Sequence, residues 1–234
     1  MKHTFLLLFC LFALSHGARS GTAPGLPEEQ LTYSINWPSG LSLGESHLSA
    51  ASSKSSDSPT RLHLEFQVDA AVPGFQVMDR YQSNATPDYC SVDLEKNTLH
   101  GKKKVEEKTT FDQQAGTASR ETGGGGKSEV QISSCGRDAL TYLYYVRHEL
   151  GQGRLPAAQT VYFGAPYQVR LEFAGTQAIR MGDKNVEADR LKASAKGPSS
   201  EISFEIFFLK DTGRTPALVR VPLSLATFTM ELVK

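Results

Sequence analysis

The sequence predicts a mainly β protein in which a curved antiparallel sheet, or a partly open barrel, wraps around a single α-helix. Many short segments alternate apolar and polar residues, which is the period of a strand with one buried face. One segment, residues 133–153, instead has the spacing and end signals of an amphipathic helix. Because strands do not alternate with helices along the chain, a parallel α/β architecture is excluded.

The N-terminus has the plan of a secretory signal peptide over residues 1–18. A basic start at Lys2 precedes an apolar run over residues 5–14, and small residues follow at the cleavage point. This run is shorter than the roughly 20 residues that cross a bilayer, although a retained anchor stays an open alternative. No later segment reads as membrane-spanning, so we expect a soluble, periplasmic or secreted chain.

After the signal segment, the sequence predicts a flexible Gly- and Pro-rich lead-in over residues 19–30 and a single β-rich domain over residues 31–234. Residues 50–59 are polar and are predicted to be a loop. The predicted strands before the helix cover residues 31–37, 41–48, 62–68, 75–81, 90–94, 102–111 and 130–132. Those after it cover residues 160–163, 167–173, 178–181, 186–195, 202–208, 218–225 and 227–232.

The predicted helix is capped by Ser134, carries Asp138 in its first turn, and stops at Gly151 and Gly153. On a helical wheel one apolar arc holds most of the large side chains, extended on one side by Leu140 and Tyr144. The members of the arc itself are Ala139, Tyr142, Leu143, Val146 and Leu150, and the opposite, wetter face holds Thr141, Tyr145, His148 and Glu149.

Arg147 is the exception, because it projects into the apolar arc. A buried guanidinium without a partner is very costly, so it should meet a carboxylate, backbone carbonyls or a ligand anion. In the simpler interpretation the aliphatic part of the Arg147 side chain packs against apolar residues, and its guanidinium reaches the edge of the sheet. Arg147 and its neighbour Tyr144 are therefore candidates for a ligand contact or for a buried polar contact.

Two cysteines, Cys90 and Cys135, remain beyond the signal segment. An even number in an oxidising compartment favours a disulfide, and two separate buried thiols are the alternative. The chain-entropy model assigns about 4 kcal/mol to a bridge that closes a loop of this length.

Composition and motifs exclude several function classes. Lys plus Arg and Asp plus Glu both number 25, and this balance argues against nucleic acid. The histidines are isolated, without metal-ligand spacing, and no nucleophile motif is present. The glycine run at residues 123–126 lacks the strand and helix of a phosphate-binding loop and reads as a hairpin tip. We expect no cofactor and no metal.

Several of these residues resemble a known family. The helix run CGRDALTYLYYVRHELGQG, the later EIFFLKDTGRTP and the closing strand FTMEL look like the bacterial extracytoplasmic family DUF3108. The motif positions are Asp138, Leu140, Tyr144, Tyr145 and Arg147 in the helix, and Asp211, Arg214 and Pro216 near the end. The resemblance implies an envelope location and no established activity. In shape the pattern is also similar to the half-barrels of periplasmic lipoprotein carriers.

Together these patterns favour a non-catalytic binding or accessory protein of the cell envelope. Aromatic residues on the dry strand faces, such as Phe173, Phe204 and Phe208, are candidates to line a groove around the helix. A lipid-like, amphipathic ligand would lie between sheet and helix. The alternatives are a structural protein that offers strand edges to an envelope partner, and an undetected hydrolase.

Overall fold

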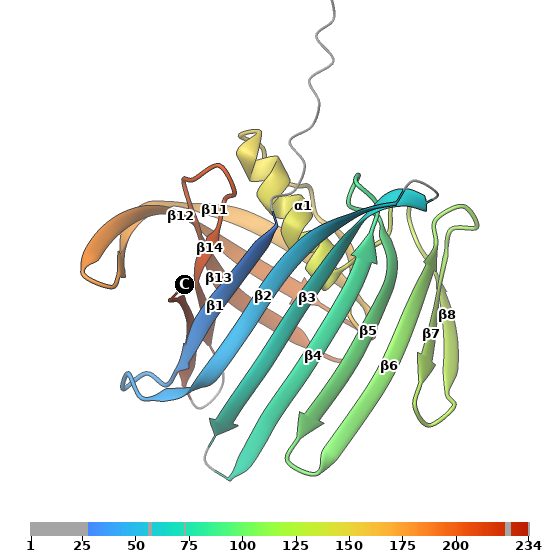
Figure 1. Cartoon of the computed structure of the whole chain (residues 1–234), viewed down its shortest axis with the longest axis horizontal. Helices are drawn as coiled ribbons and strands as arrows, with labels where there is room; N and C mark the ends of the chain where they lie inside the picture. The colour runs from blue at the N-terminus through green and yellow to red at the C-terminus, as the bar shows by residue number, and fades with distance from the viewer. Residues whose placement is uncertain (1–27, 56–57, 73, 223–225, 234) are drawn as a thin grey trace, which may run out of the picture.

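The computed structural model describes residues 28–55, 58–72, 74–222 and 226–233 (Figure 1). In this part of the chain, fifteen strands form one sheet that curves around a single helix, α1. The fold class predicted from the sequence is therefore confirmed. The predicted signal peptide, residues 1–18, lies outside the described residues, as does most of the predicted lead-in.

The strands before the helix form consecutive antiparallel hairpins that run from the middle of the sheet to the edge strand β8. Their bounds are β1 (Glu29–Asn36), β2 (Ser42–Ser55), β3 (Ser58–Val72), β4 (Phe75–Ala85), β5 (Ser91–His100), β6 (Lys103–Asp112), β7 (Thr117–Thr122) and β8 (Lys127–Gln131). The glycine run at residues 123–126 lies in the β7–β8 turn.

The remaining strands follow the same plan toward the opposite edge, β9. The bounds are β9 (Arg137–Asp138), α1 (Ala139–Gly151), β10 (Gln159–Tyr162), β11 (Pro166–Met181), β12 (Lys184–Lys196), β13 (Glu201–Leu209), β14 (Pro216–Pro222) and β15 (Thr227–Leu232). β1 pairs antiparallel with β15, so the first and last described strands meet inside the sheet. β9 and β10 run parallel because α1 crosses over between them.

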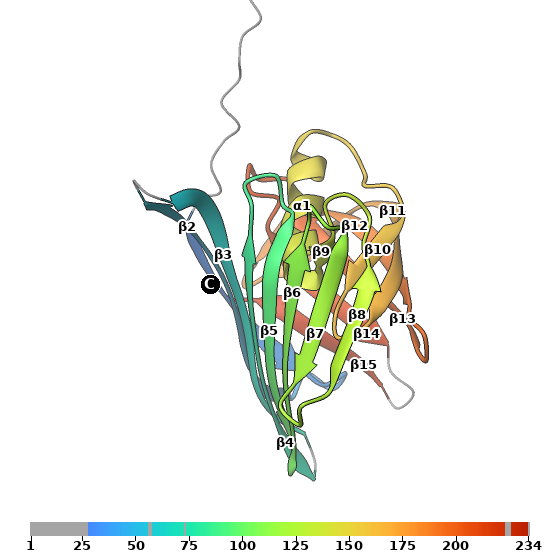
Figure 2. The ribbon, with the colours of Figure 1, turned by 90° about the vertical axis from the view of Figure 1, so that its right-hand side faces the viewer.

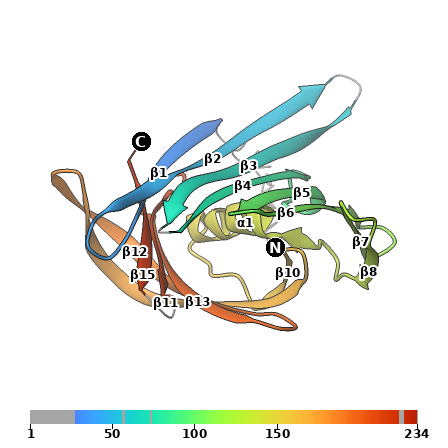
Figure 3. The same cartoon turned by 90° about the horizontal axis from the view of Figure 1, so that it is seen from below.

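The helix lies between the two halves of the curved sheet, with β1–β6 on one side and β11–β13 on the other (Figures 2 and 3). Leu140 and Tyr144 belong to a buried cluster with side chains of the first half. Tyr142 and Val146 belong to a second cluster, with Phe208 of β13. Burial of apolar surface on both sides of α1 adds to the β1–β15 pairing in holding the two halves of the sheet together.

The start of the helix differs from the sequence prediction. Asp138, not Ser134, is the N-cap, and its carboxylate accepts hydrogen bonds from the backbone N–H groups of Leu140 and Thr141. Residues 137–138 cannot be helical because they pair with β10 as strand β9. The disulfide at Cys135 also ties the preceding segment to the β4–β5 turn.

Two other expectations about local structure were wrong. The polar segment 50–59 was expected to be a loop, but β2 extends to Ser55 and β3 begins at Ser58. Ala50 pairs with Leu64 and is buried. The alternation of buried and exposed side chains along β2 therefore continues with small residues. β1 begins at Glu29, so the last residues of the predicted lead-in belong to the sheet.

Three side chains are buried or exposed differently from the prediction: two that the helical wheel places on the wetter face of the helix, and one aromatic side chain that was expected to line a groove. Thr141 is fully buried, and Tyr145 is half-buried, because the sheet covers more of the helix than one arc. Phe173 is 58% exposed. The register of β11 against β12 shifts between Phe173 and Thr176, and such an irregularity re-aims side chains.

Candidate ligand-binding site

An apolar hollow of about 820 Å³ lies between α1 and the concave face of β10–β13. We call this space the apolar hollow. It falls in the range of about 300–1,000 Å³ that is typical of small-molecule sites. Its wall is apolar or aromatic apart from a polar group at the β12–β13 turn, which consists of Ser200, Glu201 and Ser203. The shape and lining fit a mostly apolar ligand with one polar end.

The periods of the helix and of the strands place these side chains on the wall of the apolar hollow. On the helix, Ala139, Tyr142, Leu143 and Val146 recur at intervals of three and four residues, which places them on one face. On the strands every second residue points inward, and the inward set on β11 and β13 is Val169, Leu171, Phe204, Ile206 and Phe208. The sequence therefore specified these wall residues, but not the space between them.

Tyr142, which lines the apolar hollow, carries an unpaired and buried polar atom. The residue is 6% exposed, and within the described part of the chain its hydroxyl has no hydrogen-bond partner. Burial raises the pKa of Tyr142 to about 12, so the hydroxyl stays protonated at neutral pH and can donate. Buried hydroxyl groups normally have partners, so this atom marks a place where a ligand group would be stabilised.

Arg147 does not line the apolar hollow; it lies on the other side of α1. Its guanidinium binds both carboxylate oxygens of Glu29, and its Nε donates to the Gly213 carbonyl at 2.9 Å. Tyr144 donates its hydroxyl to Glu29 Oε1 at 2.7 Å. We call this group of four residues the Arg147 cluster. Burial acts to lower the pKa of Arg147, but the hydrogen bonds and charge of Glu29 outweigh it and raise the pKa.

Sequence reasoning specified the kind of partner that Arg147 needs but did not identify Glu29. Glu29 was assigned to the lead-in, and it is separated from Arg147 by 118 positions. Both Arg147 and Tyr144 are occupied by protein partners, so they hold β1 against α1. The structure gives them no contact with the apolar hollow.

Asp138 is the centre of a second buried polar group. Its Oδ2 accepts hydrogen bonds from the hydroxyls of Ser83 (2.5 Å), Ser91 (2.6 Å) and Thr141 (2.8 Å). Burial raises the pKa of Asp138, and these hydrogen bonds oppose that shift. Because β4 and β5 supply the serines, the network fixes the start of α1 to the first half of the sheet. No sequence pattern identified the two serines as partners of Asp138.

A family model described as "Protein of unknown function (DUF3108)" matches residues 32–233. The chain belongs to the DUF3108 family.

A structural neighbour supports the architecture. The chain is similar to the crystal structure of a beta-barrel-like protein of domain of unknown function DUF1849 from Brucella abortus. The TM-score is 0.61 and the sequence identity 8%, over 88% of this chain and 95% of that chain. This likeness shows the fold alone. None of the curated proteins compared with it matches this chain.

The late DUF3108 motif forms the turn that receives Arg147. Asp211 accepts hydrogen bonds from the backbone N–H and the hydroxyl of Thr215, at 2.9 and 2.7 Å. Arg214 pairs with Asp189 of β12 at 2.9 Å. These contacts hold the turn between β13 and β14, whose Gly213 carbonyl binds Arg147. The helix motif and the late motif therefore meet in space.

The other DUF3108 motif positions also have packing roles. The Pro216 carbonyl accepts a hydrogen bond from the Tyr33 hydroxyl at 2.9 Å, which joins β14 to β1. Leu140 is buried in the core of the first half. The ring of Tyr145 lies beneath the guanidinium of Arg137, at 3.8 Å from centroid to Cζ.

Cys90 and Cys135 form a disulfide, as the sequence favoured. The bridge joins the β4–β5 turn to the segment before β9, two places that are 45 residues apart in the chain.

Removing this bridge is expected to lower the free energy of unfolding by about 3 kcal/mol, because it constrains the unfolded chain. The variant is Cys90→Ala with Cys135→Ala, measured by urea unfolding. The unmutated chain, kept reduced in dithiothreitol, should show the same loss. Equal unfolding midpoints for the bridged and unbridged proteins would contradict the prediction.

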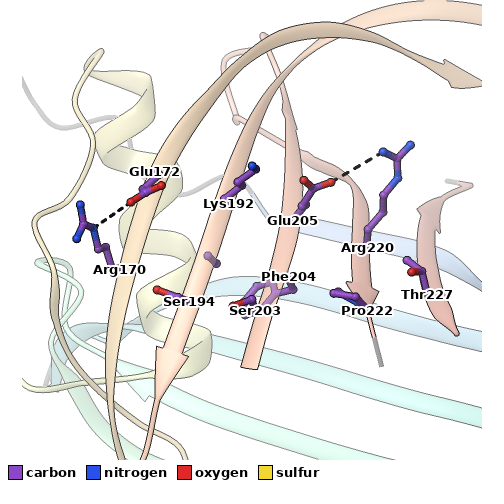
Figure 4. A pocket seen from close by; sticks show the side chains of 11 residues that line it. Arg170, Glu172, Lys192, Ser194, Ser203, Phe204, Glu205, Arg220, Pro222 and Thr227 are labelled. Carbon is purple, nitrogen blue, oxygen red and sulfur yellow. Dashed lines mark ion pairs between the residues drawn. The ribbon is translucent and has the colours of Figure 1, made fainter. Parts of the chain in front are cut away.

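The outer face of the same strands carries a second, polar hollow of about 540 Å³ (Figure 4). Its two carboxylates each lie against an arginine, Glu172 with Arg170 at 3.3 Å and Glu205 with Arg220 at 3.9 Å. Glu172 and Glu205 alternate along β11 and β13 with the inward-facing Leu171 and Phe204, so both carboxylates lie on the outer face. A catalytic pair of free carboxylates, which the hydrolase alternative requires, finds no support here.

Metal and membrane features are also absent from the described ranges. Within them, no three His, Cys, Asp or Glu side chains come together in a way that could hold a metal ion. In the same residues, no helix has both the length and the apolar character needed to cross a bilayer.

Proposed function

We propose that this chain is a non-catalytic binding protein of the cell envelope that holds an amphipathic ligand between α1 and β10–β13. The apolar hollow is the observation that carries this proposal. Its wall of Leu, Val, Ile and Phe side chains would be hydrated when empty, and covering it with an acyl or similar chain is favourable. The polar group at the β12–β13 turn and the Tyr142 hydroxyl give an amphipathic molecule places for its polar end.

The proposed location outside the cytoplasm has two supports. Residues 1–18 have the sequence plan of a signal peptide. The Cys90–Cys135 disulfide is of the kind that persists in oxidising compartments. A binding role in the envelope is consistent with both.

The alternative, an assembly protein that pairs through an exposed strand edge, has less support. Strand β8, at one edge of the described sheet, is short and exposes Lys127 and Glu129. Charged side chains on an edge strand discourage pairing with another chain. The opposite edge, β9, has only two residues.

Filling the apolar hollow tests the proposal directly. Ala195 on β12 points into the hollow, whereas the adjacent Ser194 lines the outer, polar hollow. Ala195→Trp is expected to weaken binding of the uncharged apolar dye N-phenyl-1-naphthylamine by about tenfold or more, equivalent to about 1.4 kcal/mol. Fluorescence titration measures this, and native mass spectrometry of the purified unmutated chain should show a co-purifying hydrophobe.

Ser194→Trp is the matched control, because it adds a similar volume one residue away on the opposite face. It should bind the dye like the unmutated protein. Thermal unfolding of both variants shows whether each is folded. Equal dye binding by the two folded variants would contradict a ligand site in the apolar hollow.

A further inference from the structure

Two residues near the start of α1 carry an unpaired polar atom: Arg137 in β9 and Tyr142 in the helix. Within the described residues, the buried Nε of Arg137 and the buried hydroxyl of Tyr142 both lack a hydrogen-bond partner. Such atoms are rare in folded proteins, because each loses its hydration without compensation. Two donors without acceptors near the start of α1 indicate a missing acceptor.

Tyr142 is one of the residues that line the apolar hollow, and Arg137 lies beside another of them, Val161. Arg137 pairs in parallel register with Val161, so the two side chains lie on the same face of the sheet, and Val161 lines the hollow. The Arg137 guanidinium stacks on the Tyr145 ring, whose centroid is 6.4 Å from that of Tyr142. Arg137, Tyr145 and Tyr142 therefore form a row from the sheet edge to the wall of the hollow.

The charge of Arg137 is not neutralised by the described part of the chain. Its Nη1 donates only to uncharged oxygens, at 3.0 Å to Gln159 Oε1 and 3.4 Å to the Cys135 carbonyl. The nearby carboxylate of Glu149 is held by Arg154, at 2.8 and 2.9 Å. Burial lowers the pKa of Arg137, which is the expected effect on a guanidinium without an anionic partner. Arginine nevertheless stays charged in proteins.

We propose that the ligand is an acidic amphiphile whose anionic oxygens bind Arg137 and Tyr142 while its apolar chain fills the apolar hollow. This inference rests on the proposed function and adds the chemistry of the head group. Carboxylate and phosphate share that chemistry, since both accept charge-assisted hydrogen bonds from a guanidinium and a hydroxyl. The free Nε and the hydroxyl supply two such donors.

Two probes that differ in the charge of the head group test whether the ligand must be anionic. The fluorescent acid 11-(dansylamino)undecanoic acid is expected to bind the full chain about tenfold or more tightly than its uncharged primary amide, since hydrogen bonds to charged groups are the strong ones. Hexadecanoate and hexadecyl phosphate are then used as competitors. Displacement by either acid supports the inference and identifies carboxylate or phosphate, whereas equal displacement by uncharged hexadecanol overturns it.

Two variants test the residues. Tyr142→Phe removes only the unpaired hydroxyl, and Arg137→Gln removes the charge; each is expected to reduce acid binding about tenfold and to reduce binding of the uncharged amide much less. Tyr144→Phe and Arg80→Gln are the matched controls, because Tyr144 and Arg80 already have protein partners, Glu29 and Glu65, and both variants should bind the acid normally.

The outcomes separate the two proposals. Failure of both the acid and the amide to bind would overturn the proposed function and this inference together. Equal binding of acid and amide, or normal acid binding by folded Tyr142→Phe and Arg137→Gln proteins, would overturn this inference and leave the apolar hollow as a site for uncharged amphiphiles.

Discussion

Replacing Asp138 with alanine is expected to lower the free energy of unfolding by about 4 kcal/mol or more. The loss of an N-cap costs about 1 kcal/mol by itself. Here the same change also leaves two buried hydroxyl donors without an acceptor, at about 1–3 kcal/mol each. One is Ser91, and the other is either Ser83 or Thr141, because these two hydroxyls lie 3.0 Å apart and only one of them can donate to the other. Because these serines lie on β4 and β5, the helix loses both its cap and its attachment to the first half of the sheet. Urea unfolding followed by tyrosine fluorescence measures the change.

Asp112→Ala is the matched control. The Asp112 carboxylate also accepts two backbone N–H groups, from Gln114 at 3.0 Å and Ala115 at 2.7 Å, but it lies exposed in a turn. Water can replace those hydrogen bonds, so the loss should be much smaller. Similar losses for the two alanine variants would show that the buried network around Asp138 contributes little.

Arg147→Met is expected to lower the free energy of unfolding by about 3–5 kcal/mol, the range for breaking a buried ion pair from one side. The side chains of Arg147 and Glu29 are only 4% and 13% exposed. After the change, the Glu29 carboxylate keeps only the Tyr144 hydroxyl as a hydrogen-bond donor, and the Gly213 carbonyl loses its donor. β1 and the β13–β14 turn should then separate from α1 more easily.

A double-mutant cycle isolates the pair from other effects of the substitution. Arg147→Met combined with Glu29→Gln should be less destabilised than the sum of the two single variants, because the double variant leaves no unpaired charge. Lys108 and Glu95 form a matched exposed pair, with side chains 55% and 43% exposed, whose coupling should be about 0–1 kcal/mol. A coupling for Arg147 and Glu29 no larger than that would refute a stabilising role for the Arg147 cluster.

Both predictions concern residues that the sequence singled out, but for partly different reasons. The wheel showed that Arg147 enters an apolar arc and needs a carboxylate or carbonyl, and the structure supplies one of each. Asp138 was predicted to add charge to the first turn, whereas it is the cap itself and is buried. The difference arises because local patterns report the spacing of residues along one element, and burial depends on what other elements cover it.

The serines and Glu29 could not have been identified from the sequence. Ser83 and Ser91 look like ordinary strand residues, and Glu29 like part of a polar lead-in. Each acquires its role from a partner more than 40 positions away, which no periodicity encodes. Residues 50–55 show the converse problem, since these small and polar residues continue β2 because β3 pairs with them.

The sequence by itself determined the mainly antiparallel β class, the single helix in the described chain and the resemblance to DUF3108, and it favoured the pairing of Cys90 with Cys135. These follow from the periods of two and 3.6 residues and from short motifs, which are local properties. Only the tertiary structure decided that the sheet covers α1 from two sides, that Glu29 binds Arg147, and that space remains between α1 and β10–β13 beside Tyr142. The physical reason is the curvature of the sheet, which depends on register shifts and on pairing between strands far apart in the sequence. This curvature sets the distance between α1 and the strands that face it. The sequence specifies the residues on those walls but not the distance between them.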